Sequence, residues 1–271
     1  MSFPDLNAHF KRFCDQKVAE WGGKVDRVNL IQSGYEQYGF FIDQQTYQYY
    51  GSPTIITTPS QVWKREYENG SSVEQELRIE FSEKRTDSFT WSLTEGFNIT
   101  TSTSVTIGVP GEFGIGGSVS TELSFSSTQE KTETRERTWT IDSPLRIPAH
   151  TKVVAIVIID ELKGDQTFYL KCRLNRYVCS NSPSPVGPPG GSKHYYWFWP
   201  VSMIFTEMPL DRFRVSGSTV LFEGSGSFKT QGSLDIYAKV TETPLTAAGK
   251  TETYELRGRS SLVSASLAPE V

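Results

Sequence analysis

Lysine and arginine are absent from a long stretch in the middle of the chain. No basic residue occurs between Arg85 and Lys131, and the segment from Ile99 to Gln129 carries only two charges, Glu112 and Glu122. The remaining basic residues are scattered, and the chain has a formal net charge of -4. Because the sequence offers no basic stripe for a phosphate backbone, we expect no nucleic-acid partner.

Long apolar runs are also missing. No segment approaches the roughly 18 consecutive apolar residues of a membrane-spanning helix. The first residues, MSFPDLNAHFKRFCDQ, lack the basic-then-apolar pattern of a secretory signal. We therefore expect a protein that is soluble when made, has no recognisable signal peptide, and is secreted or released by another route before it reaches a target cell membrane.

Cysteine and histidine are scarce, with three residues of each. Cys14, Cys172 and Cys179 are too few for a disulfide-dense scaffold. Cys172 and Cys179 could pair across a loop, although unpaired thiols are favoured. None of the histidines has a Cys, Asp or Glu at the spacing of a metal site or a catalytic triad. We expect no catalytic residue, no metal and no cofactor, and hence a protein that is not an enzyme.

A helical pattern occurs only at the start of the chain. Leu6, Phe10 and Phe13 recur at three- to four-residue spacing, and Gly22-Gly23 ends the run as a C-cap would. After Val25, short and long runs of β-branched and aromatic residues predict strands. The runs at 61–85 and 128–159 exceed the usual five or six residues of a strand. The sequence thus predicts a mainly β fold with one helix and an elongated body.

Aromatic residues concentrate in two stretches, 34–51 and 193–205. A Pro- and Gly-rich segment directly before the second stretch, 179–192, predicts a loop. Tyrosine and tryptophan combine an apolar face with a polar edge, which suits sugar stacking and the bilayer interface. The alternative is that alternate members fill a core. The candidates for target recognition are Tyr35, Tyr38, Tyr47, Tyr49, Tyr50, Tyr195, Tyr196, Trp197 and Trp199.

The segment without basic residues alternates with a period of two. Its even positions are Ser, Thr, Gly and Glu, and a turn at 109–112 would pair the two arms as an amphipathic hairpin. Each arm has the roughly 9 to 11 residues of a transmembrane β-strand, and several copies of the chain would be needed to close a barrel. The apolar side of this hairpin comprises Val105, Ile107, Val109, Phe113, Ile115, Val119, Leu123 and Phe125.

An ordinary β-sandwich offers another explanation, in which the hairpin simply covers the core. A solvent-facing arm normally carries lysine to block edge-to-edge association, and these arms carry none. Charge is massed on either side instead, in residues 80–87 and 129–139. Uncharged arms between charged strands favour a segment that enters a membrane conditionally.

The Ser/Thr-rich hairpin is followed by STQEKTETRERTWTIDSPLRIPAHTKVVAIVII, residues 127–159, with its I-x-x-P-L-x-I-P turn and apolar strand. In these features the chain resembles the aerolysin-like β-pore-forming toxins, in the branch of epsilon-toxin, mosquitocidal toxin and the hydralysins. The resemblance implies a mainly β, elongated fold with an aromatic-rich head (1–60 and 161–212) and a pore-forming body (61–160 and 213–271).

The resemblance also implies a function. Such a protein would bind a membrane lipid, glycan or protein receptor, assemble into a homo-oligomeric ring, and insert the hairpin at about 97–128. Glu112 and Glu122 would line the pore lumen. A C-terminal propeptide, about 246–271, could be cleaved at Lys250, Arg257 or Arg259, or it could be a frayed tail with no role. The alternative function is a lectin-like β-protein that binds a surface without making pores.

Overall fold

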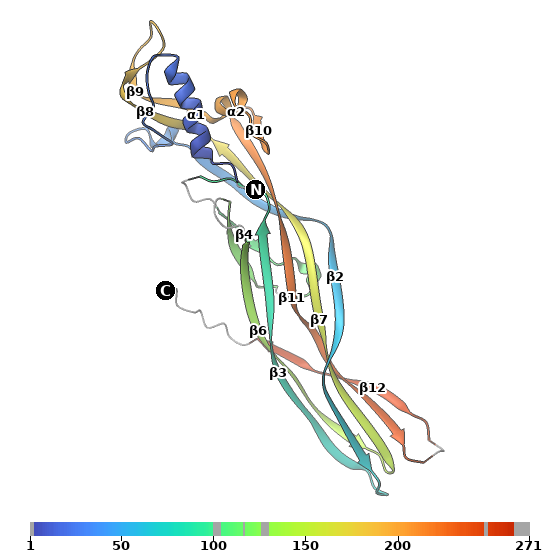
Figure 1. The fold of residues 1–271 in the computed structure, drawn as a ribbon. Coiled ribbons are helices and arrows are strands. Elements are labelled where there is room, and N and C mark those ends of the chain that lie inside the picture. The colour runs from blue at the N-terminus through green and yellow to red at the C-terminus, as the bar shows by residue number, and fades with distance from the viewer. Residues whose placement is uncertain (1–2, 100–103, 116, 126–129, 247–248, 263–271) are drawn as a thin grey trace.

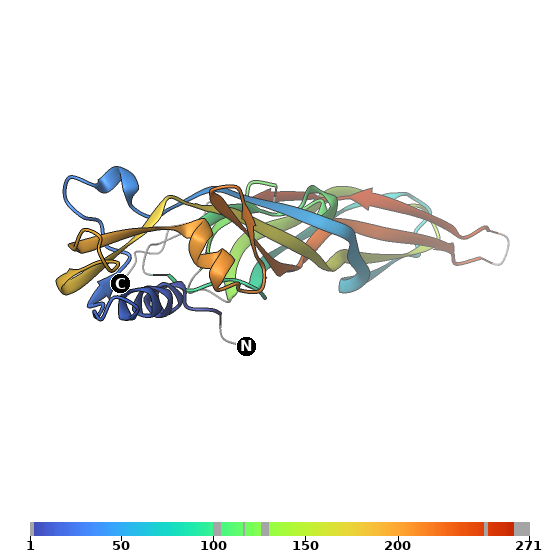
Figure 2. The same ribbon diagram turned by 90° about the horizontal axis from the view of Figure 1, so that it is seen from above.

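The molecule is elongated, with a small head at one end of a long β-body (Figure 1). The computed structural model describes residues 3–99, 104–115, 117–125, 130–246 and 249–262. Three strands run from the head along the body: β2 (Phe41–Asn69), β7 (Thr151–Asn175) and β11 (Thr219–Pro244). The body remains thin and its strands run lengthwise when the molecule is seen from above (Figure 2). These observations confirm the predicted mainly β, elongated fold.

Helix α1 (Leu6–Ala19) covers one side of the head and confirms the predicted N-terminal helix (Figure 1). The Asp5 side chain caps it by accepting a hydrogen bond from the Ala8 backbone N–H at 3.0 Å. Gly22, at φ +73°, follows its end. One face of α1 buries Leu6, His9, Phe10, Phe13, Cys14 and Val18.

The rest of the head is a small antiparallel sheet and its connections. The sheet has the order β1 (Arg27–Val28), β8 (Tyr177–Val186), β9 (His194–Pro200). The short helix η1 (Glu36–Tyr38) precedes β2, and β10 (Phe213–Ser216) pairs with the start of β11.

Two expectations for the head were wrong. More than half of the segment predicted as a loop, residues 179–186, belongs to strand β8. Its prolines at 183 and 185 lie in the irregular pairing between Asn181 and Val186, where no ladder N–H is needed. A second helix, α2 (Val201–Glu207), directly follows Pro200, which is its N-cap. Within the described residues, neither helix is long and apolar enough to cross a membrane.

The body is built on one antiparallel sheet that divides into two layers. Its strand order is β13 (Arg259–Leu262), β6 (Glu130–Ile147), β3 (Gln75–Leu93), β11, β7, β2, and β12 (Glu252–Arg257) also pairs with β11. β3 pairs with β11 only between residues 88–93 and 226–231. Beyond that point β3 and β6 form one layer, β7 and β11 form the other, and an apolar cluster fills the space between them.

Strands run across the head–body boundaries expected from the sequence. The boundary at 60/61 lies inside β2, and the boundary at 160/161 lies inside β7. The division into domains remains a prediction, but any movement of the head relative to the body has to be transmitted through these continuous strands.

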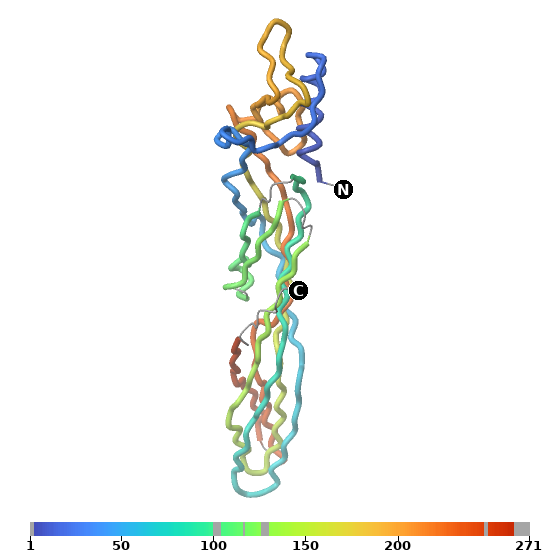
Figure 3. The backbone as a smooth tube through the Cα atoms, turned by 90° about the vertical axis from the view of Figure 1, so that its left-hand side faces the viewer, coloured from blue at the N-terminus to red at the C-terminus, as the bar shows by residue number. Residues whose placement is uncertain are grey.

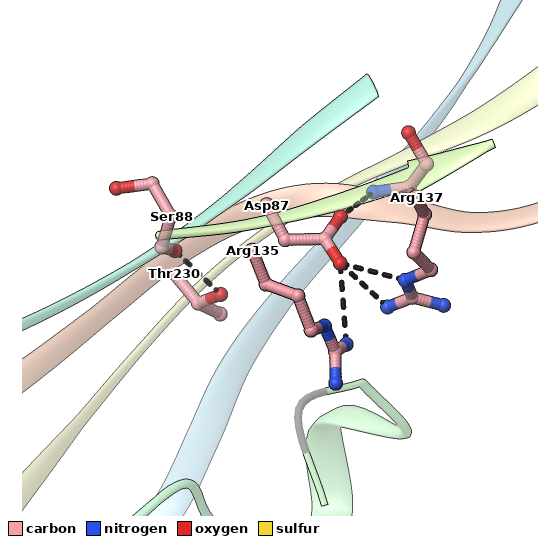
Figure 4. Close-up of polar contacts among 6 residues, drawn as sticks. Asp87, Ser88, Arg135, Arg137 and Thr230 are labelled. Carbon is pink, nitrogen blue, oxygen red and sulfur yellow. Dashed lines mark hydrogen bonds and ion pairs between the residues drawn. The ribbon is translucent and has the colours of Figure 1, made fainter. Parts of the chain in front are cut away.

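A buried carboxylate marks the place where β3 leaves β11 (Figure 4). Thr230 still donates a side-chain hydrogen bond to the Ser88 carbonyl, at 3.0 Å, but the next residue towards the fork, Asp87, is fully buried. Its Oδ2 accepts hydrogen bonds from Arg135 at 3.2 Å and Arg137 at 2.7 Å. The carboxylate is therefore the shared counter-charge of two largely buried guanidinium groups on β6.

The same carboxylate also binds a backbone N–H of β11 near the point where β3 leaves that strand. Asp87 Oδ1 accepts the Ser233 N–H at 3.1 Å, at an irregularity in β11 between Ser233 and Asp235. Gly232 leaves the space for it, since a Cβ there would lie 2.5 Å from Oδ1. Asp87 thus replaces strand pairing with side-chain hydrogen bonds where the two layers separate.

We predict that Asp87→Asn lowers the free energy of unfolding by about 3 kcal/mol, because it leaves two largely buried arginines without their counter-charge. Urea unfolding followed by tryptophan fluorescence measures this. Asp142→Asn is the matched control, since Asp142 forms an exposed pair with Arg78, and its midpoint should stay near that of the wild type. Equal midpoints for the two variants would contradict the prediction.

Candidate functional site

The predicted hairpin forms a separate two-stranded sheet against the upper body (Figure 3, green segment). It comprises β4 (Ser104–Gly108), the short helix η2 (Gly111–Phe113) and β5 (Ser120–Ser124). The expected span of about 97–128 includes residues 100–103, 116 and 126–128, which lie outside the described residues. A two-stranded sheet is not stable alone in water, so this one depends on the surface that covers it.

The pairing of β4 with β5 places the apolar side chains on one face. Val105 lies opposite Leu123, and Ile107 lies opposite Thr121. All four are buried, whereas Thr106 and Glu122, the pair between them, are exposed. Of the eight apolar residues predicted to form one side, six are buried, and Val109 and Val119 are half-buried in the same cluster. The apolar face is covered by protein.

The expected tight turn at 109–112 is absent from this structure. Strand β4 ends at Gly108 and β5 begins at Ser120. One further hydrogen bond, from the Val109 N–H to the Val119 carbonyl at 3.2 Å, precedes a connection that is longer than a tight turn. Pro110 is the N-cap of η2, and Gly114, at φ +67°, ends it in the left-handed region. The longer connection lets Phe113 and Ile115 turn into the core, which a two-residue turn would not allow.

Phe113 docks into a notch in strand β7. Its side chain is 1% exposed, and its ring centroid lies 5.5 Å from that of Phe228 on β11. A Cβ on Gly164 would lie 2.2 Å from the Phe113 ring, so only glycine allows this contact. The tip of the hairpin is therefore seated on the body at Gly164.

Two tyrosines expected on the recognition surface lie under the hairpin instead. Tyr49 donates a hydrogen bond to the Gly108 carbonyl at 2.8 Å, and the Gly108 N–H donates to the Tyr47 hydroxyl at 3.2 Å. The indole N–H of Trp91 donates to the Tyr49 hydroxyl at 2.9 Å. Alternation along β2 turns Tyr50 to the other face, where it stacks on Tyr169 with ring centroids 3.9 Å apart.

Polar contacts join the second arm to β6. Thr121 donates a hydrogen bond to Glu133 at 3.0 Å, and the Lys131 ammonium lies 3.5 Å from the Glu122 carbonyl oxygen. The Glu122 carboxylate accepts a hydrogen bond from the Ser104 hydroxyl across the exposed face of the hairpin. Glu112 is exposed in η2. Both glutamates thus lie away from the buried apolar face.

The aromatic candidates in the head divide between surface and core. Tyr35, Tyr38, Tyr195 and Tyr196 are exposed, Tyr35 and Tyr195 by about half. Trp197 is half-buried and donates a hydrogen bond to the Val186 carbonyl at 2.9 Å, and Trp199 is buried and bonded to Ser180.

Phe198 extends the exposed aromatic group and was not among the predicted residues. Its ring centroid lies 5.5 Å from that of Tyr35 and 5.9 Å from that of Tyr38. Phe198 lies in β9 between Trp197 and Trp199, which face the core. Because side chains alternate along a strand, this position predicts that Phe198 lies on the opposite face, away from the core.

The three candidate cleavage sites differ in their surroundings. Lys250 is exposed in the connection between β11 and β12. Arg257 ends β12 and pairs with Asp235, and Arg259 begins β13, opposite Thr140 of β6. Residues 247–248 and 263–271 of the predicted propeptide lie outside the described residues. All three residues are exposed, and Lys250 alone of the three lies outside a strand. Proteolytic activation stays a prediction.

All three cysteines are free and buried, as the sequence favoured. Burial raises the pKa of Cys14 to about 12 and that of Cys179 to about 11, and it raises the pKa of Cys172 as well. Their thiols stay protonated at neutral pH and are poor nucleophiles. Cysteines introduced at the surface would therefore react selectively.

A family model described as Clostridium epsilon toxin ETX/Bacillus mosquitocidal toxin MTX2 matches residues 43–253. The match covers strands of both head and body and the whole hairpin. A cytotoxin of Pseudomonas aeruginosa is 25% identical over 176 residues, which make up 62% of this chain and 62% of the cytotoxin. The match thus spans less than two thirds of that relative.

Solved structures share the fold at low sequence identity. The Cry23Aa1 and Cry37Aa1 binary complex gives a TM-score of 0.74 at 19% identity, over 97% of this chain and 98% of the other. A non-toxic crystal protein from Bacillus thuringiensis gives 0.67 at 12% identity, over 92% and 100%. The β-pore-forming protein Mpp75Aa1.1 from Brevibacillus laterosporus gives 0.62 at 17%, over 97% and 98%.

These structures show the fold alone, since a protein described as non-toxic shares it. The family model, which matches most of the chain, goes further. With its elongated body and its docked amphipathic hairpin, the chain belongs to the toxin family of Clostridium epsilon toxin and Bacillus mosquitocidal toxin.

Proposed function

We propose that this protein is a pore-forming cytolysin that binds a cell surface, forms a homo-oligomer and inserts the hairpin of each copy into a transmembrane β-barrel. The observation that carries the proposal is the two-sided hairpin. Its apolar side is covered by the body, and its other side consists of Ser, Thr, Gly and Glu without a basic residue. Membership of a toxin family supports the same function.

The two faces of the hairpin match the two environments of a transmembrane β-barrel. In a transmembrane β-barrel, apolar side chains face lipid and small polar side chains face a wet lumen. Val105, Ile107 and Leu123 already share one face, and Thr106 and Glu122 share the other. Burying one such apolar side chain contributes roughly 1.5–3 kcal/mol. The hairpin can therefore leave the body only for another apolar environment, and lipid is one.

We predict that single cysteines at Ile107 and Leu123, labelled with an environment-sensitive dye, report a lipid environment when the protein lyses erythrocytes or releases calcein from liposomes. The three native cysteines are replaced by alanine, because Ile107 and Leu123 are as buried as the native thiols and the introduced cysteines have to be labelled in denaturant before refolding. Thr106→Cys is the matched control, because its side chain lies on the opposite face and should report water.

The same assay distinguishes the alternatives. Binding to cells without leakage, and without detergent-resistant oligomers on gels, would mean a lectin-like binding protein instead of a pore former. Leakage with no lipid signal at either Ile107 or Leu123 would mean that another segment inserts.

Glu122 should face the lumen of the proposed barrel, with Glu112 near its tip, so we predict a mild preference for cations. Glu122→Gln should reduce the ratio of cation to anion permeability, because it removes one negative charge per protomer. Reversal potentials in planar bilayers under a salt gradient measure this. Glu76→Gln, an exposed change in β3 outside the hairpin, is the control. An anion-selective wild-type pore would contradict the placement of Glu122 in the lumen.

We propose that the exposed aromatic group of the head recognises the target surface. Tyr35 and Tyr38 are exposed, with ring centroids 5.5 Å and 5.9 Å from that of Phe198. Both should tolerate alanine without loss of fold, and the double variant should bind cells more weakly. Flow cytometry of labelled protein measures binding. Tyr254→Ala is the control, because Tyr254 is an exposed tyrosine on β12, at the far end of the body (Figure 1). Equal binding by both variants would place recognition elsewhere.

A further inference from the structure

One edge of β4 faces β2. At this edge the backbone N–H and C=O of Gly108 are paired with no strand among the described residues. Val109 N–H donates to the Val119 carbonyl at 3.2 Å, so residues 109 and 119 form a hydrogen-bonded pair of the antiparallel ladder. The neighbouring pair, Gly108 and Ser120, is then non-hydrogen-bonded, with the N–H and C=O of Gly108 directed away from β5. These two groups need partners from the body.

Two tyrosine hydroxyls from β2 form hydrogen bonds with the N–H and the C=O of Gly108. The Tyr49 hydroxyl donates to the carbonyl of Gly108, and the Tyr47 hydroxyl accepts its N–H. Tyr47 and Tyr49 lie on the same face of β2, with ring centroids 5.8 Å apart at 85°. Side chains thus take the place of a third strand beside the hairpin.

The contact is supported from below by buried aromatic residues. Trp91 is fully buried, and its indole N–H donates to the Tyr49 hydroxyl at 2.9 Å. The Tyr49 ring packs edge-on against Phe168 and Phe228. Burial raises the pKa of Tyr49, so its hydroxyl keeps the proton that it donates to Gly108 at neutral pH.

We propose that Tyr47 and Tyr49 form a latch on Gly108 that holds the hairpin against β2 and limits how often it opens. Because the latch uses side-chain hydroxyls instead of a paired strand, opening breaks two hydrogen bonds to Gly108 and leaves the ladder between β4 and β5 intact. The freed N–H and C=O of Gly108 can then pair with the backbone of another strand. The latch itself concerns the protein in solution, and only its consequence at a membrane rests on the proposed function.

The test is hydrogen exchange of the full chain in the absence of membranes. Tyr49→Phe and Tyr47→Phe each keep the ring and remove the hydroxyl, and each should speed exchange of the Gly108 amide by about fivefold or more. The Val109 amide, which donates to Val119 within the ladder, should exchange at the wild-type rate. Tyr67→Phe is the matched control, since Tyr67 is near the other end of β2 and packs against the second apolar cluster. Its exchange in the hairpin should equal that of the wild type.

An internal readout separates local opening from general destabilisation. Amides of β7 around Val157, in the lower body, should exchange at the wild-type rate in all variants. Tyr47→Phe removes only the acceptor of one N–H and leaves the Trp91 bond in place, so it tests the latch even if Tyr49→Phe disturbs the core. Unchanged exchange at Gly108 in both variants, or equal acceleration in β7, would overturn the latch.

Liposome leakage measured on the same proteins distinguishes this inference from the proposed function. Faster exchange with a shorter lag before leakage supports both. Faster exchange with no leakage from any variant, the wild type included, leaves the latch standing and contradicts the proposed function. Leakage by the wild type with unchanged exchange in both latch variants overturns the latch and leaves the proposed function standing.

Discussion

The apolar face of the hairpin has to be covered in every state of this protein, and the upper half of the molecule depends on that contact. Six of its side chains are buried in the same cluster as helix α1 and the upper parts of β3, β7 and β11. At roughly 1.5–3 kcal/mol for each buried side chain, their contribution is comparable with the net stability of a typical domain. The hairpin and the body therefore stabilise each other, and any release of the hairpin must supply a new cover at once.

Side chains replace strand pairing at the places where the sheets divide. Asp87 accepts the Ser233 N–H where β3 leaves β11, and Tyr47 and Tyr49 bind Gly108 where the hairpin lies against β2. In both places buried backbone groups are satisfied without extending a ladder. Long strands can thus exchange neighbours along their length while the Ser233 N–H and the two backbone groups of Gly108 stay hydrogen-bonded. Such junctions are also the positions at which one layer can separate from another without breaking a whole row of backbone hydrogen bonds.

Local patterns in the sequence predicted much of this arrangement. The spacing of Leu6, Phe10 and Phe13 identified α1, and the period of two assigned the side chains of β4 and β5 to the correct faces. Local patterns failed where a distant contact decided the outcome. The turn at 109–112 was wrong because Phe113 is drawn into the notch at Gly164, and strand β8 was missed because its prolines fall where its pairing with β9 is irregular. No pattern near Tyr47 or Tyr49 indicated that their partner would be Gly108, some 60 residues away.

Alternation and helical spacing depend on the backbone geometry of adjacent residues, which is why the mainly β fold, the N-terminal helix and the two faces of the hairpin could be assigned from the chain alone. The charge distribution can also be read from the chain alone, since the uncharged arms and their charged flanks are evident in the sequence. Which surface covers the apolar face, which tyrosines reach the exterior, and where Asp87 finds its arginines were decided by tertiary packing. These contacts join residues far apart in sequence, and their geometry exists only once the strands β2, β3, β6, β7 and β11 have been brought together.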